Sequence, residues 1–441
     1  MRGGRRPCGI ILQDYNKIVC SEEKRFLSLK KLVFALLSAL FIGISLSAGA
    51  EEMVVPIKIT TWTHDESQLE MLGRFVDEFA AVKGIRIKTT FETLAFQDYS
   101  STLMMELSGE DAPDLYWVPE TAAIAFIASG NLAILNEALA AYHPEDLVES
   151  ALELWWYRDK LYALPFSTSP FVLLYNADLF AKAGVRTPDE LAAEGRWTWE
   201  EFRKVSKQIR DVTGVYGFQT VDGDGYTVHT LHTLLPIIRS YGGDTWNKKG
   251  DVLIDTEESI AAVKLFHDML YVDGSVVPPG NDSSFYDGAA AMTVGQISRV
   301  SKLDKAEWKW GITTLPGGVS VIGQAALGAF SRGKNVKLAA ELAAYMTSES
   351  CAARVAGIWP PARYSVLKSE AFLTSNKRIS AKQMSSAVAT AIASGHVLPS
   401  HALYPHIAAE AQIAYDKLWN ADADVAAILH EIGKIYRYYI Y

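Results

Sequence analysis

The sequence YRDKLYALPFSTSPFVLLYNADLFAKAGV, residues 157–185, decides the fold. After a polar turn, residues 161–165 alternate apolar and less apolar side chains as a strand does, and this strand is expected to end at its proline. Residues 171–175 form a second apolar run that favours a strand, and residues 176–184 are typical of a short helix. Residues 167–169, between the two runs, offer hydroxyl groups. Two interpretations stay open: two strands that carry the chain between lobes with the hydroxyls in the gap, or an ordinary edge strand with a kink.

The same stretch resembles the extracellular solute-binding protein family 1, the sugar-binding subunits of bacterial ABC importers that include maltose-binding proteins. The pattern of that family is G-K-L-Y-G-L-P, followed by Y-N-K-D-L-F-x-K-A-G. The resemblance continues on both sides and covers nearly all of the chain after residue 50. The matching residues are Lys160, Leu161, Tyr162, Leu164, Pro165, Tyr175, Asn176, Asp178, Leu179, Phe180, Lys182, Ala183 and Gly184.

The resemblance implies an α/β fold of two lobes, the type II periplasmic binding protein fold, in which each lobe is a mostly parallel sheet flanked by helices. Three interlobe crossings are then expected, near Ser167, Ala325 and Phe372. The expected lobes are residues 51–167 with 325–372 for the N-terminal lobe, and residues 168–324 with 373–441 for the C-terminal lobe. Chain length agrees with two lobes, because 391 of the 441 residues follow residue 50, which is more than one core usually supports.

Residues 1–50 are typical of a signal peptide with an extended leader. Residues 32–46 form an apolar run that follows two lysines and precedes the small residues 48–50. The run is too short for a transmembrane helix, so we expect cleavage after residue 50 and a mature protein that begins at Glu51. No cysteine directly follows the predicted cut, which predicts a free periplasmic protein rather than a lipoprotein.

Charge and cysteine content restrict the classes of partner. Residues 1–50 hold 8 Lys and Arg and 3 Asp and Glu, which leaves 34 basic and 48 acidic residues and a net charge of −14. This charge disfavours nucleic acid and strongly anionic ligands. Cys351 is the only cysteine of the sequence after residue 50, so an internal disulfide is excluded and stability must come from burial.

A β-α-β unit opens the expected N-terminal lobe. Residues 54–62 and 85–91 are typical of strands, and the apolar spacing between them is helical. Such a unit pairs its strands in parallel and favours ligands beyond their carboxyl ends, where Trp62, His64 and Asp65 lie. Asp65 also stands where a helix N-cap is expected, and capping and ligand contact are compatible.

A second group of candidate contacts follows residues 112–117, which resemble the family's A-P-D-hydrophobic strand. The family places polar or aromatic ligand contacts in the next loop, and Trp117, Glu120 and Thr121 are expected to occupy it. A register shift of one residue stays open at Pro119. The alternative is that Trp117 belongs to the core and Glu120 is solvated.

Further candidates stand at positions where family members contact their ligand. They are Ser169, His232, Gln296, Gly323, Gln324, Trp359 and Tyr404. Gln296 stands where many members carry a tryptophan, so stacking is lost there and a polar contact is expected instead. His229 and His232 share a helix face at a spacing that metal sites also use, but no other His or Cys motif accompanies them, and no metal is expected.

The resemblance implies the periplasmic solute-binding subunit of an ABC importer, which binds a sugar or oligosaccharide between its lobes and delivers it to the transmembrane permease subunits. The aromatic candidates suit the C–H faces of a sugar and the polar candidates suit its hydroxyls. We expect a monomer without cofactor, catalytic residues or enzymatic activity.

Three alternatives stay open. A binder of glycerol phosphate or a polyamine shares this architecture, and sequence does not separate an importer subunit from a chemoreceptor-linked sugar sensor. A periplasmic glycosidase is a third reading, with Asp65 and Glu120 as its carboxylate pair. The sequence contains no G-x-S-x-G, H-E-x-x-H, phosphate-loop or G-x-G-x-x-G motif to support an enzyme.

Overall fold

The computed structural model describes residues 54–227 and 229–440. The chain separates into two compact units, Met1–Val55 with Gly84–Arg86, and Pro56–Lys83 with Ile87–Tyr441. The first unit contributes only Val54, Val55 and the turn at Gly84–Arg86 to the described residues, so the fold is that of the second unit. The expected signal peptide, residues 1–50, lies outside the described residues. Within them, no helix combines the length and apolar character that crossing a membrane requires.

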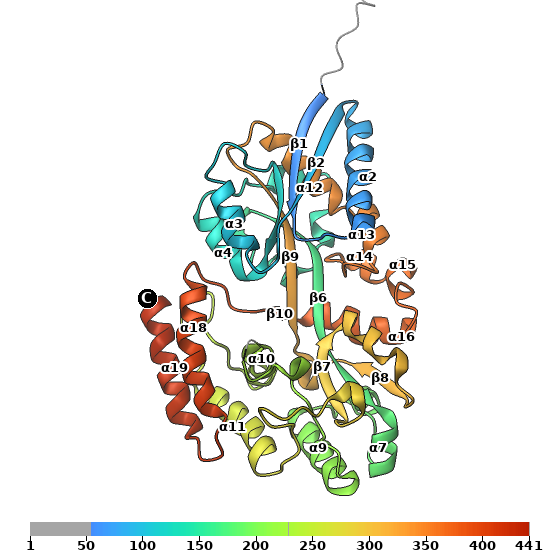
Figure 1. The fold of residues 1–441 in the computed structure, drawn as a ribbon, viewed down its shortest axis with the longest axis vertical. Helices are drawn as coiled ribbons and strands as arrows, with labels where there is room; N and C mark the ends of the chain where they lie inside the picture. The colour runs from blue at the N-terminus through green and yellow to red at the C-terminus, as the bar shows by residue number, and fades with distance from the viewer. Residues whose placement is uncertain (1–53, 228, 441) are drawn as a thin grey trace, which may run out of the picture. The chain divides into compact units, whose positions relative to one another are not determined.

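An 8-stranded sheet forms the centre of the structure (Figure 1). Its strand order is β2-β1-β3-β9-β6-β7, with β10 paired to β9 and β8 paired to β6, while β4 and β5 form a separate hairpin. The strands are β1 (Val54–Thr61), β2 (Arg86–Thr93), β3 (Leu115–Pro119), β4 (Trp156–Tyr157), β5 (Lys160–Leu161), β6 (Leu164–Asn176), β7 (Met292–Gln296), β8 (Trp310–Thr313), β9 (Val321–Ala329) and β10 (His396–Val397).

Helices flank both ends of this sheet. Helices α2 and α12 lie beside β1 and β2 in Figure 1, and α7 and α9 lie at the opposite end, near β8. The helices are α2 (Glu66–Lys83), α3 (Tyr99–Glu106), α4 (Ala123–Ala128), α5 (Asn136–Leu139), α6 (Glu149–Leu152), α7 (Ala177–Ala183), α8 (Pro188–Ala193), α9 (Trp199–Thr213), α10 (Thr230–Ser240), α11 (Glu257–Tyr271), α12 (Val336–Met346), α13 (Glu349–Val355), α14 (Tyr364–Leu367), α15 (Glu370–Leu373), α16 (Ala381–Gln383), α17 (Thr390–Ser394), α18 (Tyr404–Tyr415) and α19 (Val425–Ile440).

The direction of pairing distinguishes two kinds of strand. Strand β1 pairs with β3 in parallel, and isolated parallel bridges join Tyr216 to Ala290 and Gln219 to Thr293. Among the described strands of the large sheet, every antiparallel ladder involves β6 or β9. Of the ladders described in this sheet, only β1 with β3 and β9 with β10 are parallel, so the sheet is mixed and the expectation of mostly parallel pairing is wrong for it.

Strand β6 is one continuous strand of 13 residues, not two strands with a break at Pro165. Its first part pairs with β9, from Leu164 to Pro170, and its second part lies between β7 and β8. The register shifts between Pro165 and Ser167, so a local bulge takes up the proline, which has no N–H to donate, without ending the strand. The edge-strand interpretation is therefore wrong, and β6 links β9 to β7 and β8.

Helix α7 follows β6 as the sequence predicts. The Asn176 side chain accepts hydrogen bonds from the backbone N–H groups of Asp178 and Leu179, both at 3.1 Å, which caps the first turn. Gly184 ends the helix with a φ of 67°, in the left-handed region that glycine adopts without steric cost. Both ends of this helix are thus set by local residues.

A third segment is fastened to β6 at Thr168. The backbone N–H of Thr168 donates to the carbonyl oxygen of Pro360 at 2.8 Å, and its hydroxyl lies 2.9 Å from the carbonyl oxygen of Pro361. Phe372, where the third crossing is expected, is buried in the short helix α15. Pro360 and Pro361 therefore lie close to the point at which β6 changes its strand partners, while the crossing near Phe372 stays a prediction.

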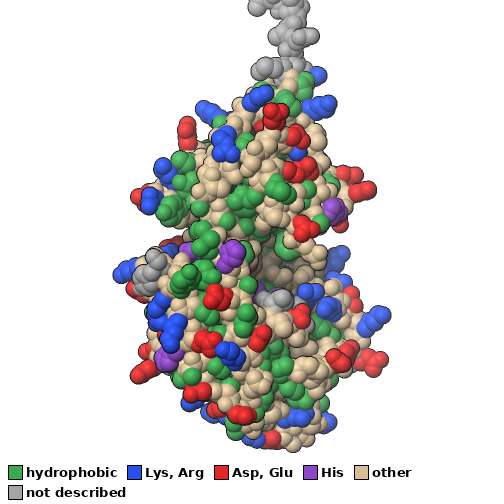
Figure 2. All heavy atoms as spheres, turned by 60° about the vertical axis from the view of Figure 1, so that its left-hand side comes forward, with side chains coloured by type: hydrophobic (Ala, Val, Ile, Leu, Met, Phe, Trp, Pro, Cys, Tyr) green, Lys and Arg blue, Asp and Glu red, His purple; other side chains and the backbone are tan. Residues whose placement is uncertain are grey.

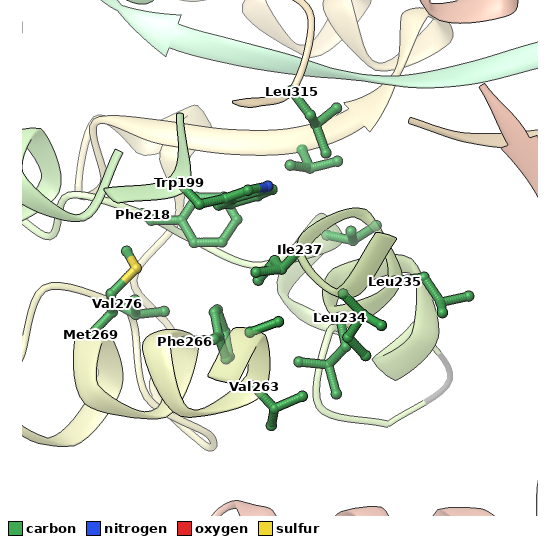
Figure 3. Packing of buried hydrophobic residues seen from close by; sticks show 14 of the residues in the cluster. Trp199, Phe218, Leu234, Leu235, Ile237, Val263, Phe266, Met269, Val276 and Leu315 are labelled. Carbon is green, nitrogen blue, oxygen red and sulfur yellow. The ribbon is translucent and has the colours of Figure 1, made fainter. Parts of the chain in front are cut away.

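A hydrophobic core packs α9, α10 and α11 together (Figure 3). The rings of Phe202 and Phe218 lie 5.0 Å apart, and Trp199, Ile237 and Phe266 are buried in the same cluster. Because these side chains come from elements far apart in the sequence, burial of their apolar surface holds this part of the fold together without a disulfide. Cys351, the one described cysteine, is buried and free.

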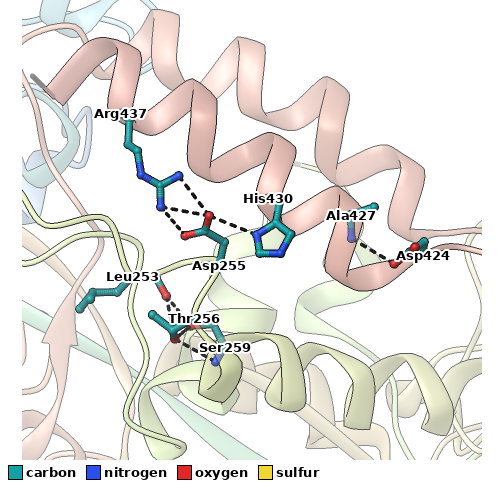
Figure 4. Close-up of polar contacts among 8 residues, drawn as sticks. All are labelled: Leu253, Asp255, Thr256, Ser259, Asp424, Ala427, His430 and Arg437. Carbon is teal, nitrogen blue, oxygen red and sulfur yellow. Dashed lines mark hydrogen bonds and ion pairs between the residues drawn. The ribbon is translucent and has the colours of Figure 1, made fainter.

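The C-terminal helix α19 is fixed by a half-buried carboxylate (Figure 4). Asp255 accepts hydrogen bonds from the Arg437 guanidinium, at 2.8 Å to Oδ1, and from His430 at 3.3 Å. Burial alone raises the pKa of Asp255, but these hydrogen bonds more than offset it and hold the pKa below its usual value. A Cβ at Gly433 would lie 2.5 Å from Asp255 Oδ2, so the missing side chain lets the carboxylate approach the helix.

Candidate functional site

A cavity of about 390 Å³ opens beside helices α10 and α18. Figure 2 shows the molecular surface hollowed at mid-height. The cavity volume lies in the range that small-molecule sites usually have. Its lining combines hydroxyl-bearing, aromatic and aliphatic side chains, namely Thr121, Thr227, Thr230, Leu231, His232, Leu398, Tyr404, Ile407, Ala408, Ala409, Ala411, Gln412, Tyr415 and Tyr436.

Glu120 lies directly after β3, next to the lining residue Thr121. Its Oε2 accepts a hydrogen bond from the backbone N–H of Gln324 in β9. On β9, residues 325–329 pair with β3 and residues 321–322 pair with β10. The Glu120 carboxylate therefore takes the place of a strand partner in the gap between β3 and β10, where a backbone donor would otherwise be left unpaired.

The environment of Glu120 favours the neutral form of its carboxyl group. Burial raises the pKa of Glu120 to about 8. The charge of Glu120 also acts on Tyr404, because burial raises the pKa of the Tyr404 hydroxyl to about 12 and Glu120 adds to that shift. Tyr404 lines the cavity, so Glu120 lies within electrostatic reach of the cavity wall.

Several predicted residues converge around Gly323. Ser169 in β6 is the strand partner of Gly323. A Cβ at Gly323 would lie 2.9 Å from Gln296 Nε2, 3.6 Å from the carbonyl oxygen of Ser169 and 3.8 Å from Glu120 Oε2. The bare glycine thus lets an amide lie close against β9 with a carboxylate beside it, and both carry hydrogen-bonding groups that a polar ligand can use.

His232 is joined to this group through Phe171. Phe171 in β6 pairs with Gln296 in β7, and the Phe171 ring lies 4.7 Å from the His232 ring. Burial lowers the pKa of His232 to about 3, with a contribution from His229, so the His232 imidazole is neutral at pH 7. A neutral imidazole both donates and accepts hydrogen bonds.

Three of the predicted aromatic contacts, Trp62, Trp117 and Trp359, form one cluster. The Trp117 ring centroid lies 4.8 Å from that of Trp62 and 5.5 Å from that of Trp359. Trp117 is only 1% exposed and lies within β3, because pairing with β9 extends that strand to Pro119. The expectation that Trp117 occupies the loop after the strand is therefore wrong. A small cavity of about 20 Å³ borders Trp117 and Trp359, which is room for about one water molecule.

The structure places three predicted residues apart from this convergence. Asp65 Oδ1 accepts a hydrogen bond from the backbone N–H of Gln68 at 3.1 Å, which confirms that Asp65 caps α2, and both His64 and Asp65 are exposed. The Gln324 side chain accepts a hydrogen bond from Trp155 Nε1 at 3.2 Å. Because side chains alternate along a strand, the Gln324 side chain lies on the face of β9 opposite the position of Gly323.

Sequence reasoning missed cavity residues that come from the C-terminal helices. Tyr404, Ala408, Ala411 and Tyr415 recur at helical spacing and line the cavity together, so extending the prediction from Tyr404 along one helix face is the signal that finds them. Tyr436 had no such signal, because its place in the cavity depends on how α19 packs against α18.

Comparison with known sequences identifies the family. Residues 74–380 match the family described as bacterial extracellular solute-binding protein. The arabinooligosaccharide-binding protein of Bacillus subtilis (strain 168) is 24% identical over 228 residues, which are 51% of this chain and 49% of that protein. The chain thus spans about half the length of the curated relatives that it matches.

Solved structures share the fold along most of the chain. The cyclic alpha-maltosyl-1,6-maltose binding protein from Arthrobacter globiformis superposes with a TM-score of 0.74 at 17% identity, over 88% of this chain and 99% of that one. UgpB from Mycobacterium tuberculosis, in complex with glycerophosphocholine, gives a TM-score of 0.67 at 19% identity, over 87% of this chain and 98% of that one. These similarities show the two-lobe α/β fold. Since the family match covers more than half of the chain, the chain belongs to the bacterial extracellular solute-binding proteins.

Proposed function

We propose that the protein is the solute-binding subunit of an ABC importer and that it binds a sugar or oligosaccharide between its two lobes. The cavity of about 390 Å³ carries this proposal. Its lining draws Thr121 from the proposed N-terminal lobe, residues 51–167 with 325–372, and all its other residues from the proposed C-terminal lobe, residues 168–324 with 373–441. A ligand held from both sides favours the closed arrangement by its differential affinity, and closure is what a permease can detect.

The chemistry of the site supports a polyhydroxylated ligand. Tyr404 and Tyr415 offer aromatic surfaces for the C–H faces of a sugar ring, while His232, Gln296 and Thr230 offer hydrogen-bonding groups. Members of the fold that bind oligosaccharides, such as the Arthrobacter globiformis protein, favour the same class.

Two other ligand classes stay open as alternatives. UgpB shares the fold and its structure holds glycerophosphocholine, which supports a glycerol phosphate derivative as second candidate, and a polyamine is a third. The net charge of −14 after residue 50 works against a phosphate group. A further alternative is that the protein serves a chemoreceptor instead of a permease, which would detect the same ligand-bound form.

A glycosidase is the least supported reading. Glycoside hydrolysis requires two carboxyl groups that flank the glycosidic bond, and Asp65 and Glu120 are the predicted pair. Asp65 is exposed and occupied with capping α2. The described residues that line the cavity include no Asp or Glu, so a second carboxylate for such chemistry is not supplied there. We therefore propose binding without turnover.

We expect a thermal-shift screen to show stabilisation by at least one mono- or oligosaccharide. A Kd in the range of roughly 1 μM, or about 8 kcal/mol, is expected for a cleft of this kind. Ligand at about 100 times its Kd then stabilises the folded state by about 2.7 kcal/mol, which raises the melting temperature measurably. Stabilisation by glycerol phosphate or a polyamine, but by no sugar, would contradict the proposed substrate class, and release of a product from a glycoside would contradict binding without turnover.

We further propose that the protein is a free periplasmic monomer whose mature chain begins at Glu51. Intact-mass measurement of the exported protein is expected to give the mass of residues 51–441. The small residues 48–50 after the apolar run support this cut. An added diacylglycerol, or a different first residue, would show that the predicted cut or the free form is wrong.

A further inference from the structure

Glu120 is a carboxylate without a cationic partner. Among the side chains that the structure describes, no Lys, Arg or His forms an ion pair with it, and burial is the cause of its raised pKa. Its Oε2 accepts a hydrogen bond from a neutral backbone N–H group, that of Gln324. The side chain is half-buried, and the next residue, Thr121, lines the cavity. A carboxylate in such surroundings is poorly solvated in its charged form and has no neutralising neighbour.

The cavity beside Glu120 supplies no positive charge either. Its described lining contains no Lys or Arg, and burial holds the pKa of His232 at about 3, so the imidazole stays neutral. The lining is instead rich in aromatic rings, among them Tyr404, Tyr415 and Tyr436. Aromatic faces attract cations and do not stabilise anions.

We propose that the ligand carries a protonated amine, as an amino sugar does, and that this amine is recognised by the Glu120 carboxylate. The inference rests on the proposed sugar-binding function and names the class of sugar. An ammonium group supplies the positive charge that the site lacks, and it donates hydrogen bonds to the free side of the carboxylate. A hydroxyl group donates a hydrogen bond but leaves the carboxylate charge uncompensated.

Gly323 and Gln296 complete the pocket for such a group. Because Gly323 has no side chain, the Gln296 amide can lie close against β9, beside the same glycine as Glu120 Oε2. The oxygen of the Gln296 amide can accept one hydrogen bond from the ligand, and the carboxylate can accept others. Tyr404, the titratable side chain coupled to Glu120 here, remains neutral at pH 7 because its pKa lies near 12.

Proton release distinguishes an amine from a neutral sugar. With a pKa of about 8, Glu120 in the free protein holds about 0.9 of a proton at pH 7. A cation binds to the charged carboxylate and lowers its pKa, so an amine that is already protonated at pH 7 releases up to about one proton from Glu120 on binding, and its affinity rises as the pH is raised from 6 for as long as the free amine keeps its own proton. A neutral sugar leaves the proton in place. The same shift makes the free protein less stable as pH rises from the usual pKa of a glutamate to about 8, because the unfolded chain loses that proton first.

The test is calorimetric titration with a matched pair of ligands, the glucosamine disaccharide and its N-acetylated counterpart, in two buffers with different heats of ionisation. We expect the amine form to bind more tightly and to release a proton. Glu120→Gln keeps the size of the side chain and an oxygen to accept from Gln324. It is expected to weaken binding of the amine form by about 100-fold, to abolish proton release, and to change binding of neutral sugars by less than about 3-fold.

Glu137→Gln is the matched control, since it removes the same charge from an exposed position. It is expected to leave affinity and proton release unchanged. Neutral sugars that bind as tightly as the amine form, with equal affinity in Glu120→Gln, would overturn the inference and leave the proposed sugar-binding function intact. If no sugar binds, the proposed function fails and this inference fails with it, even where a simple polyamine binds.

Discussion

Ser169→Trp is expected to weaken ligand binding by at least about 100-fold, or about 3 kcal/mol, without unfolding the protein. Ser169 pairs with Gly323, beside which the Gln296 amide and the Glu120 carboxylate lie. On β6 it shares a face with Phe171, because side chains two residues apart point the same way. The Phe171 ring contacts His232 at the cavity. An indole at position 169 is therefore expected to occupy the space that ligand and closing lobes require.

The variant is measured by calorimetric titration, after its unfolding transition has been compared with that of the wild type. Ser169→Ala is the first control, and it is expected to change the affinity by less than about 10-fold because it removes one hydroxyl only. Ser108→Trp is the second, since Ser108 is exposed and a tryptophan there adds bulk away from the cavity. Wild-type affinity in a folded Ser169→Trp protein would contradict the placement of Ser169 at the site.

Arg363→Met is expected to lower the free energy of unfolding by about 3–5 kcal/mol. Arg363 is 1% exposed, its Nε donates to the carbonyl oxygen of Thr347 at 2.7 Å, and its Nη1 lies 3.4 Å from Asp146 Oδ2. Desolvation lowers the pKa of the Arg363 guanidinium, and the hydrogen bond to Asp146 opposes that shift. Methionine fills similar space but removes the positive charge beside Asp146, which keeps only its hydrogen bonds from Ser365. It also takes the guanidinium donor from the carbonyl oxygens of Thr347 and His143, so the cost of burying these groups is no longer offset.

The measurement is denaturant unfolding of Arg363→Met beside a matched control, Arg378→Met. Arg378 also pairs with an aspartate, Asp304, but both side chains are about half exposed. Solvent screens that pair, so its loss is expected to cost less than about 1 kcal/mol. An equal decrease in the free energy of unfolding of the two variants would show that the burial of Arg363 adds no stability. It would contradict the conclusion that Arg363 anchors the chain around residue 363.

Local signals in the sequence predicted local structure well. Asn176 and Gly184 mark the two ends of α7, and Asp65 caps α2, because capping depends on residues only a few positions apart. The strand character of residues 164–176 was also visible, from two strand-favouring runs and from the family pattern. These signals share one property: the interactions that they predict join residues only a few positions apart in the sequence.

Long-range pairing decided what the sequence left open. Pro165 was expected to break the strand, but β9 offers a continuous partner, and a bulge absorbs the proline. Trp117 was expected in a loop, but β9 also extends β3 by pairing up to Pro119. The gap that Glu120 fills exists only because β3 and β10 pair with different parts of β9. None of these pairings has a signature in the residues that they affect.

The measurement that tests the central claim most directly is small-angle X-ray scattering of the wild-type protein with and without the sugar that the thermal-shift screen identifies. Binding between two lobes that close predicts a smaller radius of gyration at saturating sugar, and no such decrease in Ser169→Trp at the same concentration. A sugar that binds the wild-type protein tightly but leaves its radius of gyration unchanged would contradict binding by lobe closure.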